Sequence, residues 1–446
     1  MPRAFLLALV LLAAVSRVPA GAQASLASLA ARVAQAPDGV VRMQYDSRPD
    51  ACGDGRDMVG FRRALFGRSF ESYGGWSNVR CVAGPLRVQL TIADRRPVSV
   101  RTQIGGAWPA ATGRVTDLGT VESREAAAYF FSLVPQLEGG GRKGRILLPA
   151  VLAADASALP ELLALVRDSA RTDDTRRQAL HWVGQLGDAS VVPALVGFAR
   201  QGSSGSGGVP DNDQGDGAID TRGRRGLASA ALAALSMLDD GAGVPALIDL
   251  ARTGDVTVRH SAVFWLGQSG DARARRTLHT VIEDARENER VRGNAIFALA
   301  HGEGAAPGEF AYLRGVFPRL ESERLKEAVL QGMAEDDGDG GRWLLDRARD
   351  ASESTKVRRT ALFWAGQRQA TPTRDLVAAY RGLDDASLRE HAIFVLSQRD
   401  DDVAVNALLQ IAREDTDRRM RGKALFWLAQ RKDDRVTKLI SDLLVK

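Results

Sequence analysis

Apolar positions recur every three or four residues through most of the chain, and one pattern of them repeats. The pattern is Ala-x-Phe-Trp-x-x-Gln, in which His replaces Phe once; clear copies occupy 179–185, 262–268, 361–367 and 424–430. Weaker copies occupy 295–301 and 392–398, and degenerate ones begin at Ala230 and Ala328. From Ala230 to Ala424 the steps are 32, 33, 33, 33, 31 and 32 residues. Such a regular period predicts a solenoid of repeated helical units.

Each period contains two amphipathic helical patterns separated by short turns. In the period around residue 262, Val258, Ala262 and Leu266 fall on one arc of a helix predicted over about 256–269. The preceding helix begins near Pro245, a residue tolerated in the first turn because the N–H there has no intrahelical partner. A helix pair of this size cannot bury its apolar face alone, so we expect neighbouring pairs to stack.

The motif V-R-x-x-A-x-x-x-L-G at 258–267, with the Gly-Asp that follows it, resembles HEAT repeats of the short type found in phycobilisome bilin lyases. The resemblance covers roughly 150–446. It implies a mainly α chain, with an α-α superhelical solenoid of about eight HEAT-like repeats. It implies little about function, because one fold serves many unrelated activities.

The N-terminal part has a different pattern. Residues 1–22 are typical of a signal peptide, with an apolar run too short for a membrane span and a small-residue cleavage site at Ala20-Gly21-Ala22. A helical segment is predicted at 23–36 and a small β-rich domain at 37–115, where 86–92 and 98–104 alternate as a hairpin would. Residues 120–150 are expected to form a degenerate helical cap or join before the solenoid at 150–446.

The chain has two cysteines, Cys52 and Cys81, both in the predicted β-rich domain. In an exported protein such a pair favours a structural disulfide over a reactive thiol. The signal-peptide pattern leads us to expect a periplasmic or extracellular location. No segment after residue 22 is long and apolar enough for membrane insertion.

The first candidate site is a row of aromatic and amide side chains on the second helices, which line the concave surface in HEAT-like arrays. Two alternatives remain open: the rings form an exposed ridge for a peptide or protein partner, or they pack as core between neighbouring helices. The residues of this Phe–Gln row are Phe264, Phe297, Phe363, Phe394 and Phe426 with Gln268, Gln367, Gln398 and Gln430.

A second repeated residue is an arginine three positions before the alanine of the pattern. It lies at the edge of the buried arc and is expected to pair with an acid at a neighbouring turn, such as Asp188, Asp271 or Asp337. We interpret this Arg ladder as structural rather than ligand-binding. Its members are Arg259, Arg292, Arg358, Arg389 and Arg421.

Few residues suggest catalysis or metal binding. The five histidines share no metal-ligand spacing, and the common hydrolase, nucleotide and metalloprotease motifs do not occur. The Gly/Ser/Asp-rich insertion at 201–223 fails the calcium-loop pattern and is expected to be a flexible surface loop. We therefore expect no cofactor and no metal.

Charge disfavours nucleic acid as a partner, because residues 151–446 carry a net charge of −3 and contain no strong basic stripe. The sequence thus predicts an exported, non-enzymatic scaffold that binds a protein or peptide on the concave face of the solenoid. The alternatives are an enzymatic or ligand-binding activity in the N-terminal domain, a tetrapyrrole-handling role like that of bilin lyases, and an envelope-assembly or sensory role in which the solenoid is a spacer.

Overall fold

The computed structural model describes residues 28–56, 59–61, 81–111, 113–138, 146–155, 157–201, 226–302, 307–431 and 435–436. The expected signal peptide and nearly all of the insertion at 201–223 lie outside these residues. The chain divides into two compact units, one ending at Ala179 and the other beginning at Leu180. The helix α6 (Asp173–Leu186) spans this boundary.

The first unit is built on a mixed four-stranded sheet of order β5-β4-β1-β6. The predicted hairpin is confirmed: Asp94 and Arg95 join its strands with φ of 49° and 59°, the left-handed geometry that suits the twist of a hairpin. The strand β6 was not predicted and pairs parallel with β1. The strands are β1 (Gly39–Tyr45), β4 (Leu86–Ala93), β5 (Arg96–Ile104) and β6 (Val115–Thr120), with a separate pair β2 (Ala51–Gly53) and β3 (Val59–Phe61).

One face of this sheet is apolar because alternate residues of β1 and β4 point to the same side. The long helix α3 (Ser123–Leu137) contributes Phe130, whose ring lies 6.3 Å from that of Tyr45. The Tyr45 hydroxyl donates to the carbonyl of Pro149 at 2.8 Å, and burial raises the pKa of Tyr45 well above its usual value. The helix α3 therefore belongs to the core of the sheet domain.

Among the described residues, three more helices lie wholly in the first unit: α2 (Leu29–Ala34), α4 (Leu148–Val151) and α5 (Leu159–Arg167). The main chain of Leu29 donates to Glu125 of α3, which holds α2 against that helix. Cys52 and Cys81 form a disulfide bond in this unit. The compact N-terminal unit thus extends to Ala179, beyond the boundary expected near residue 150.

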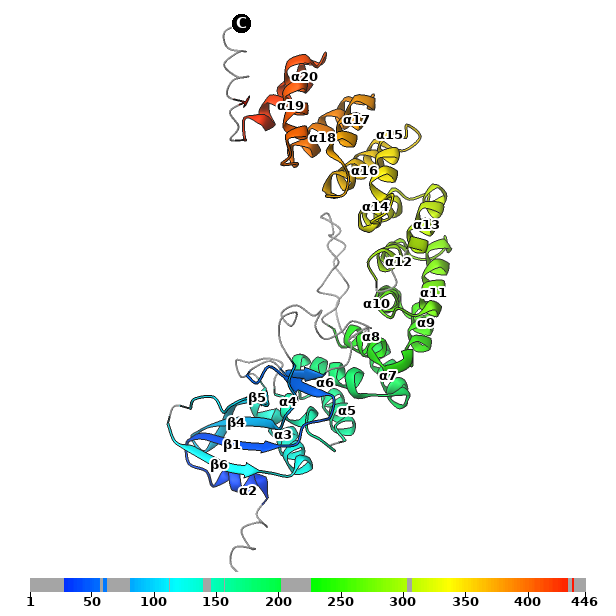
Figure 1. Cartoon of the computed structure of the whole chain (residues 1–446). Helices are drawn as coiled ribbons and strands as arrows, with labels where there is room; N and C mark the ends of the chain where they lie inside the picture. Colours follow the sequence, from blue (N-terminus) through cyan, green and yellow to red (C-terminus); the bar gives the residue numbers. More distant parts are fainter. Residues whose placement is uncertain are drawn as a thin grey trace, which may run out of the picture. The chain divides into compact units, whose positions relative to one another are not determined.

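The second unit is a stack of helix pairs (Figure 1). Its first helices form one layer and its second helices another, since each second helix contacts the second helices before and after it. The first helices are α7 (Val192–Gln201), α9 (Val244–Thr253), α11 (Ala272–Glu283), α13 (Pro307–Val316), α15 (Gly340–Arg349), α17 (Thr373–Gly382) and α19 (Asp402–Glu414). The second helices are α8 (Leu227–Met237), α10 (Val256–Gly267), α12 (Glu289–His301), α14 (Glu323–Gly332), α16 (Thr355–Gln367), α18 (Ala386–Ser397) and α20 (Arg418–Leu428).

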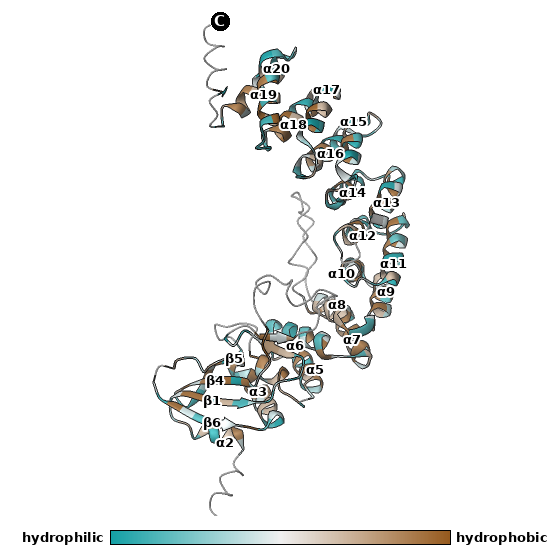
Figure 2. Cartoon of the chain, in the orientation of Figure 1, coloured by the Kyte–Doolittle hydropathy of each residue, from teal (hydrophilic) through white to brown (hydrophobic). Residues whose placement is uncertain are grey.

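The glycine of the repeated pattern lets successive second helices approach closely. A Cβ on Gly267 of α10 would lie 2.6 Å from the Cβ of Ala298 in α12, closer than side chains pack. Gly184 of α6 meets Ala234 of α8 in the same way. Apolar and polar residues lie on different sides of most helices (Figure 2). Because the helices also pack closely, their apolar sides form a continuous buried core.

Burial corrects the register of the two degenerate copies. Ala231 and Val329 are fully buried as the leading residue should be, whereas Ala230 and Ala328 are half-buried. Both copies therefore begin one residue later than the pattern predicts. With this register, Lys326 takes the place of the repeated arginine, three residues before Val329.

Candidate functional site

The Phe–Gln row lies on the second-helix layer, and none of its members is buried. Phe264, Phe297, Phe363 and Phe394 are half-buried, and Phe426 is 59% exposed. Gln268 is half-buried, whereas Gln367, Gln398 and Gln430 are exposed. The rings are thus partly exposed surface groups, which form neither a free ridge nor a closed core.

The tryptophan of the pattern is also half-buried. It packs edge-to-face against the preceding phenylalanine. The centroid distance is 5.1 Å for Phe264 and Trp265, and 5.3 Å for Phe363 and Trp364. The pattern Phe-Trp therefore places two rings together on the rim of each second helix that carries it.

The row of rings is interrupted in α14. With the corrected register, the residue equivalent to Phe297 is Gln331, which is half-buried. This substitution separates Phe264 and Phe297 from the three later rings. The largest continuous group of rings on the layer therefore belongs to α16, α18 and α20.

Within those three helices the rings are in contact from one helix to the next. His391 lies between Phe363 and Phe394, at centroid distances of 6.5 and 5.6 Å. Phe394 of α18 lies 5.4 Å from Trp427 of α20, which in turn lies 5.2 Å from Phe426. We call these five residues the aromatic row. Burial, and then the charge of Arg359, lower the pKa of His391 to about 4, so this ring is neutral at pH 7.

Several members of the Arg ladder bind main-chain carbonyls within their own repeat. Arg292 donates through Nε to the carbonyl of Ile282 at 2.9 Å, and Arg358 does the same to Ala348 at 3.0 Å. Both carbonyls end the first helix of the same repeat, where main-chain oxygens lack intrahelical partners. Arg421 caps α19 in the same way through the carbonyl of Asp415, at 2.7 Å.

The acidic partners of this ladder lie in the turn between the two helices of the next repeat. Arg259 binds Glu287 at 3.0 Å, and Arg389 binds Asp415 at 2.5 Å. Arg358 reaches Asp384 at 3.1 Å. Asp271, one of the acids named as an example of such a partner, binds Arg273 and caps α11 instead.

A second arginine ladder was not predicted. Arg399 follows the glutamine of its copy and is 6% exposed; its Nη2 donates to the carbonyls of Arg368 and Thr371 at 2.8 and 2.6 Å. Arg431 donates to Ser397 at 2.7 Å and also bonds the carbonyl of Arg399. Arg368 bonds the carbonyl of Ala334 in the same way. The repeated Gln-Arg at the ends of three copies was the signal for this ladder.

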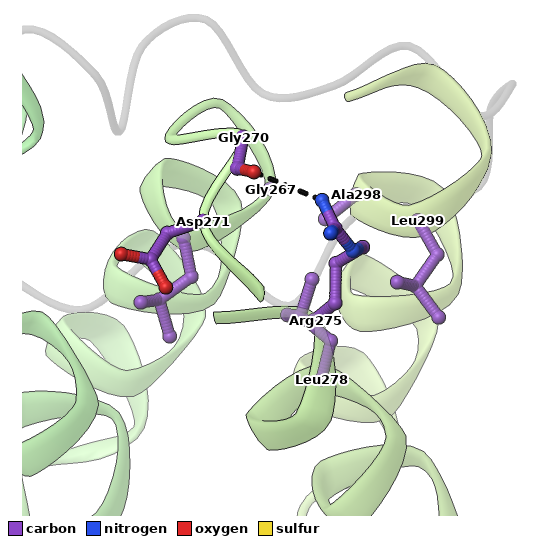
Figure 3. Close-up of a pocket in the computed structure, with 8 residues that line it drawn as sticks. Gly267, Gly270, Asp271, Arg275, Leu278, Ala298 and Leu299 are labelled. Atoms are coloured by element: carbon purple, nitrogen blue, oxygen red, sulfur yellow. Dashed lines mark hydrogen bonds between the residues drawn. The ribbon is translucent and has the colours of Figure 1, made fainter. Parts of the chain in front are cut away.

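A shallow hollow lies where α10, α11 and α12 meet (Figure 3). Its empty volume is about 210 Å³, part of it open to solvent, which is below the range of ligand sites. Arg275 donates to the carbonyl of Gly270 across it, at 2.9 Å. Such a hollow is a packing feature of the repeat and has no room for a cofactor.

One histidine–carboxylate pair lies on the first-helix layer. His279 contacts Glu309 at 2.6 Å and stacks on Tyr312 at a centroid distance of 3.8 Å, so the cluster ties α11 to α13. Among the described residues, no group of three or more His, Cys, Asp or Glu side chains is arranged to hold a metal ion. No described helix has the length and apolar character needed to cross a membrane.

This architecture, paired helices stacked in two layers, defines the second unit as an α-α solenoid. Residues 244–334 and 341–429 match the family of HEAT repeats, which confirms the predicted repeat type over this part of the chain. The chain is therefore a HEAT-like repeat protein with a small N-terminal sheet domain.

Three solved structures illustrate what the chain resembles. Human deoxyhypusine hydroxylase in complex with glycerol is 19% identical over 59% of this chain and 97% of its own, with a TM-score of 0.26. The complex of CpcE and CpcF of phycocyanin lyase from Nostoc is 18% identical over 56% and 92%, with a TM-score of 0.27. A designed armadillo repeat protein in complex with the peptide (KR)4 is 15% identical over 61% and 99%, with a TM-score of 0.21. No curated protein sequence matches the chain.

Proposed function

We propose that the protein is an exported, non-catalytic scaffold that binds a protein or peptide partner on its second-helix layer. The observation that carries the proposal is the aromatic row. Five neighbouring rings stay at the surface over three helices, although burying them would stabilise the fold. Aromatic side chains grouped on a surface are typical of protein interfaces.

Contacts between the repeats make this surface rigid. The two arginine ladders tie α18 to the turns beside α16 and α20, and Gly366 of α16 packs closely on Val395 of α18. The rings are therefore held in place before a partner arrives. A preorganised surface loses less conformational entropy on binding. The structural role of both ladders is consistent with a scaffold rather than an enzyme.

Export is supported by two features of the chain. The N-terminal pattern over residues 1–22 is typical of a signal peptide, and Cys52 and Cys81 form a disulfide of the kind that persists in oxidising compartments. A periplasmic or extracellular partner follows from this proposal.

The test compares capture of a partner by matched variants of the full chain. Wild type, Phe394→Ala, Phe426→Ala and Val403→Ala are immobilised and exposed to an extract of the source periplasm. Val403 is the control because it is also apolar and 48% exposed, but lies on α19 in the first-helix layer. A protein retained by wild type and Val403→Ala, and lost from both Phe variants, is then purified and its affinity measured for each.

Folding is checked on the same variants by urea titration. Because Phe426 is 59% exposed, removing its ring should reduce the free energy of unfolding by only about 1 kcal/mol. Lost capture by this variant would then report on binding. Equal capture by all four chains would refute the proposed surface.

A further inference from the structure

The second helices that carry the aromatic row are strongly basic. Their bounds include one carboxylate, Glu390, and eight Lys or Arg residues, of which Arg358, Arg389 and Arg421 serve the Arg ladder. The remaining five basic residues lie on or beside the exposed side of the layer. They are Lys356, Arg359, Arg418, Arg419 and Lys423.

The one carboxylate is already neutralised. Glu390 binds Arg419 and Lys423 of the next helix, both at 2.6 Å, and these contacts outweigh its partial burial and lower the pKa of Glu390. Lys356 pairs with Glu327 of α14 at 3.0 Å. Arg359 is exposed and makes no ion pair with any described residue. The charge beside the aromatic row is therefore clearly positive.

This local positive charge corrects the expectation that residues 151–446, whose net charge is −3, contain no strong basic stripe. A nucleic acid would meet repulsion over most of the unit, whereas a short acidic segment would meet only the basic part. Aromatic rings beside positively charged Lys and Arg side chains are complementary to a partner that carries both apolar and acidic side chains.

The repeat also fixes the distance between the groups of rings on neighbouring second helices. Packed helices lie about 8–10 Å apart. A chain extended in the polyproline II conformation advances about 3.1 Å per residue and turns once every three residues, so every third side chain faces the same side. A segment crossing α16, α18 and α20 would therefore meet one group of rings about every third residue. The two intervening residues would lie near the basic side chains.

We propose that the partner docks an extended segment across α16, α18 and α20, with an apolar residue about every third position and acidic residues between. This inference rests on the proposed function, because it names the chemistry of the partner for the same surface. The occupant is a peptide segment of another protein.

The test uses synthetic peptides with Leu or Phe at every third position and Glu, Gln or Lys between them. Binding to the full chain is measured by fluorescence anisotropy, with a fluorescent oligothymidylate as the nucleic-acid probe. We expect the Glu peptide to bind at least ~10-fold more tightly than the Gln peptide, and the Lys peptide to bind most weakly. The preference should shrink as salt concentration rises.

Charge-reversal variants then show which basic residues contribute to binding of the Glu peptide. Arg359→Glu and Lys423→Glu should each weaken binding of the Glu peptide several-fold. Arg374→Glu should not, because this residue has an 82% exposed side chain on α17 in the first-helix layer. Equal effects of all three substitutions would overturn the inference.

The outcomes separate the inference from the proposed function. If all three peptides bind equally well and Phe394→Ala abolishes their binding, the acidic partner is wrong and the binding surface stands. If the oligothymidylate binds more tightly than any peptide, the inference is overturned in favour of single-stranded nucleic acid. If neither Phe394→Ala nor Phe426→Ala changes binding of any peptide, both proposals fail.

Discussion

Arg399 provides the sharpest test of how the second helices are held together. Its guanidinium donates to the carbonyls of Arg368 and Thr371 at 2.8 and 2.6 Å, and the residue is 6% exposed. Methionine at this position would fill most of the volume but would leave both carbonyls without this donor. We therefore expect Arg399→Met to destabilise the second unit.

The size of the effect follows from these contacts. A hydrogen bond to a charged group contributes about 1.5–3 kcal/mol, so two such bonds would contribute about 3–6 kcal/mol. Part of this is offset, because burial of the guanidinium is itself unfavourable and lowers the pKa of Arg399. A net loss of about 2–4 kcal/mol in the free energy of unfolding is expected.

The assay is urea unfolding at neutral pH followed by tryptophan fluorescence and far-UV circular dichroism. Arg374→Met is the control, since this arginine is exposed and its contact with Asp375 is 3.7 Å long. An exposed pair of this kind contributes at most about 1 kcal/mol. Hydrogen exchange should also show faster opening of α16 and α18 in Arg399→Met. Equal midpoints for the two variants would refute the idea that the buried ladder holds the layer together.

Three further predictions concern other contacts. Gly267→Val should destabilise the second unit by about 2 kcal/mol or more, because the valine side chain would overlap Ala298. Thermal melting followed by circular dichroism should show a lower midpoint, and an unchanged midpoint would contradict the close approach of the two helices. The pKa of His391 is lowered from 6.5 to about 4, so the folded state binds this proton less readily than the unfolded state. The free energy of unfolding should therefore be highest above pH 6.5 and fall as the pH drops towards 4. Urea titrations at several pH values should show a smaller pH dependence for His391→Phe. Cys52→Ser should lower the free energy of unfolding of the first unit by about 3–4 kcal/mol, because the bond to Cys81 closes a loop of 29 residues. The same unfolding midpoint for wild type with and without reductant would argue against this contribution.

The sequence alone determined the repeat, its two-helix unit and the residues that recur in it. The reason is local: a helix buries one side, so apolar residues recur at helical spacing, and stacked copies impose the same residue at the same position. The hairpin at residues 86–104 followed from alternation for the same kind of reason. The arginine three residues before the alanine was recognisable as structural because it lies at the edge of the buried arc.

Only the tertiary structure decided which residues these side chains meet. The partners of the Arg ladder are carbonyls at helix ends and acids one repeat away, a geometry that depends on the offset between neighbouring pairs. The same offset decided that the register at Val329 differs by one residue and that Gln331 interrupts the rings. Packing of α3 on the sheet and the parallel pairing of β6 join segments far apart in sequence, which no local pattern encodes. Whether a recurring phenylalanine is core or surface likewise depends on the neighbouring helix, and here that helix leaves the ring half open.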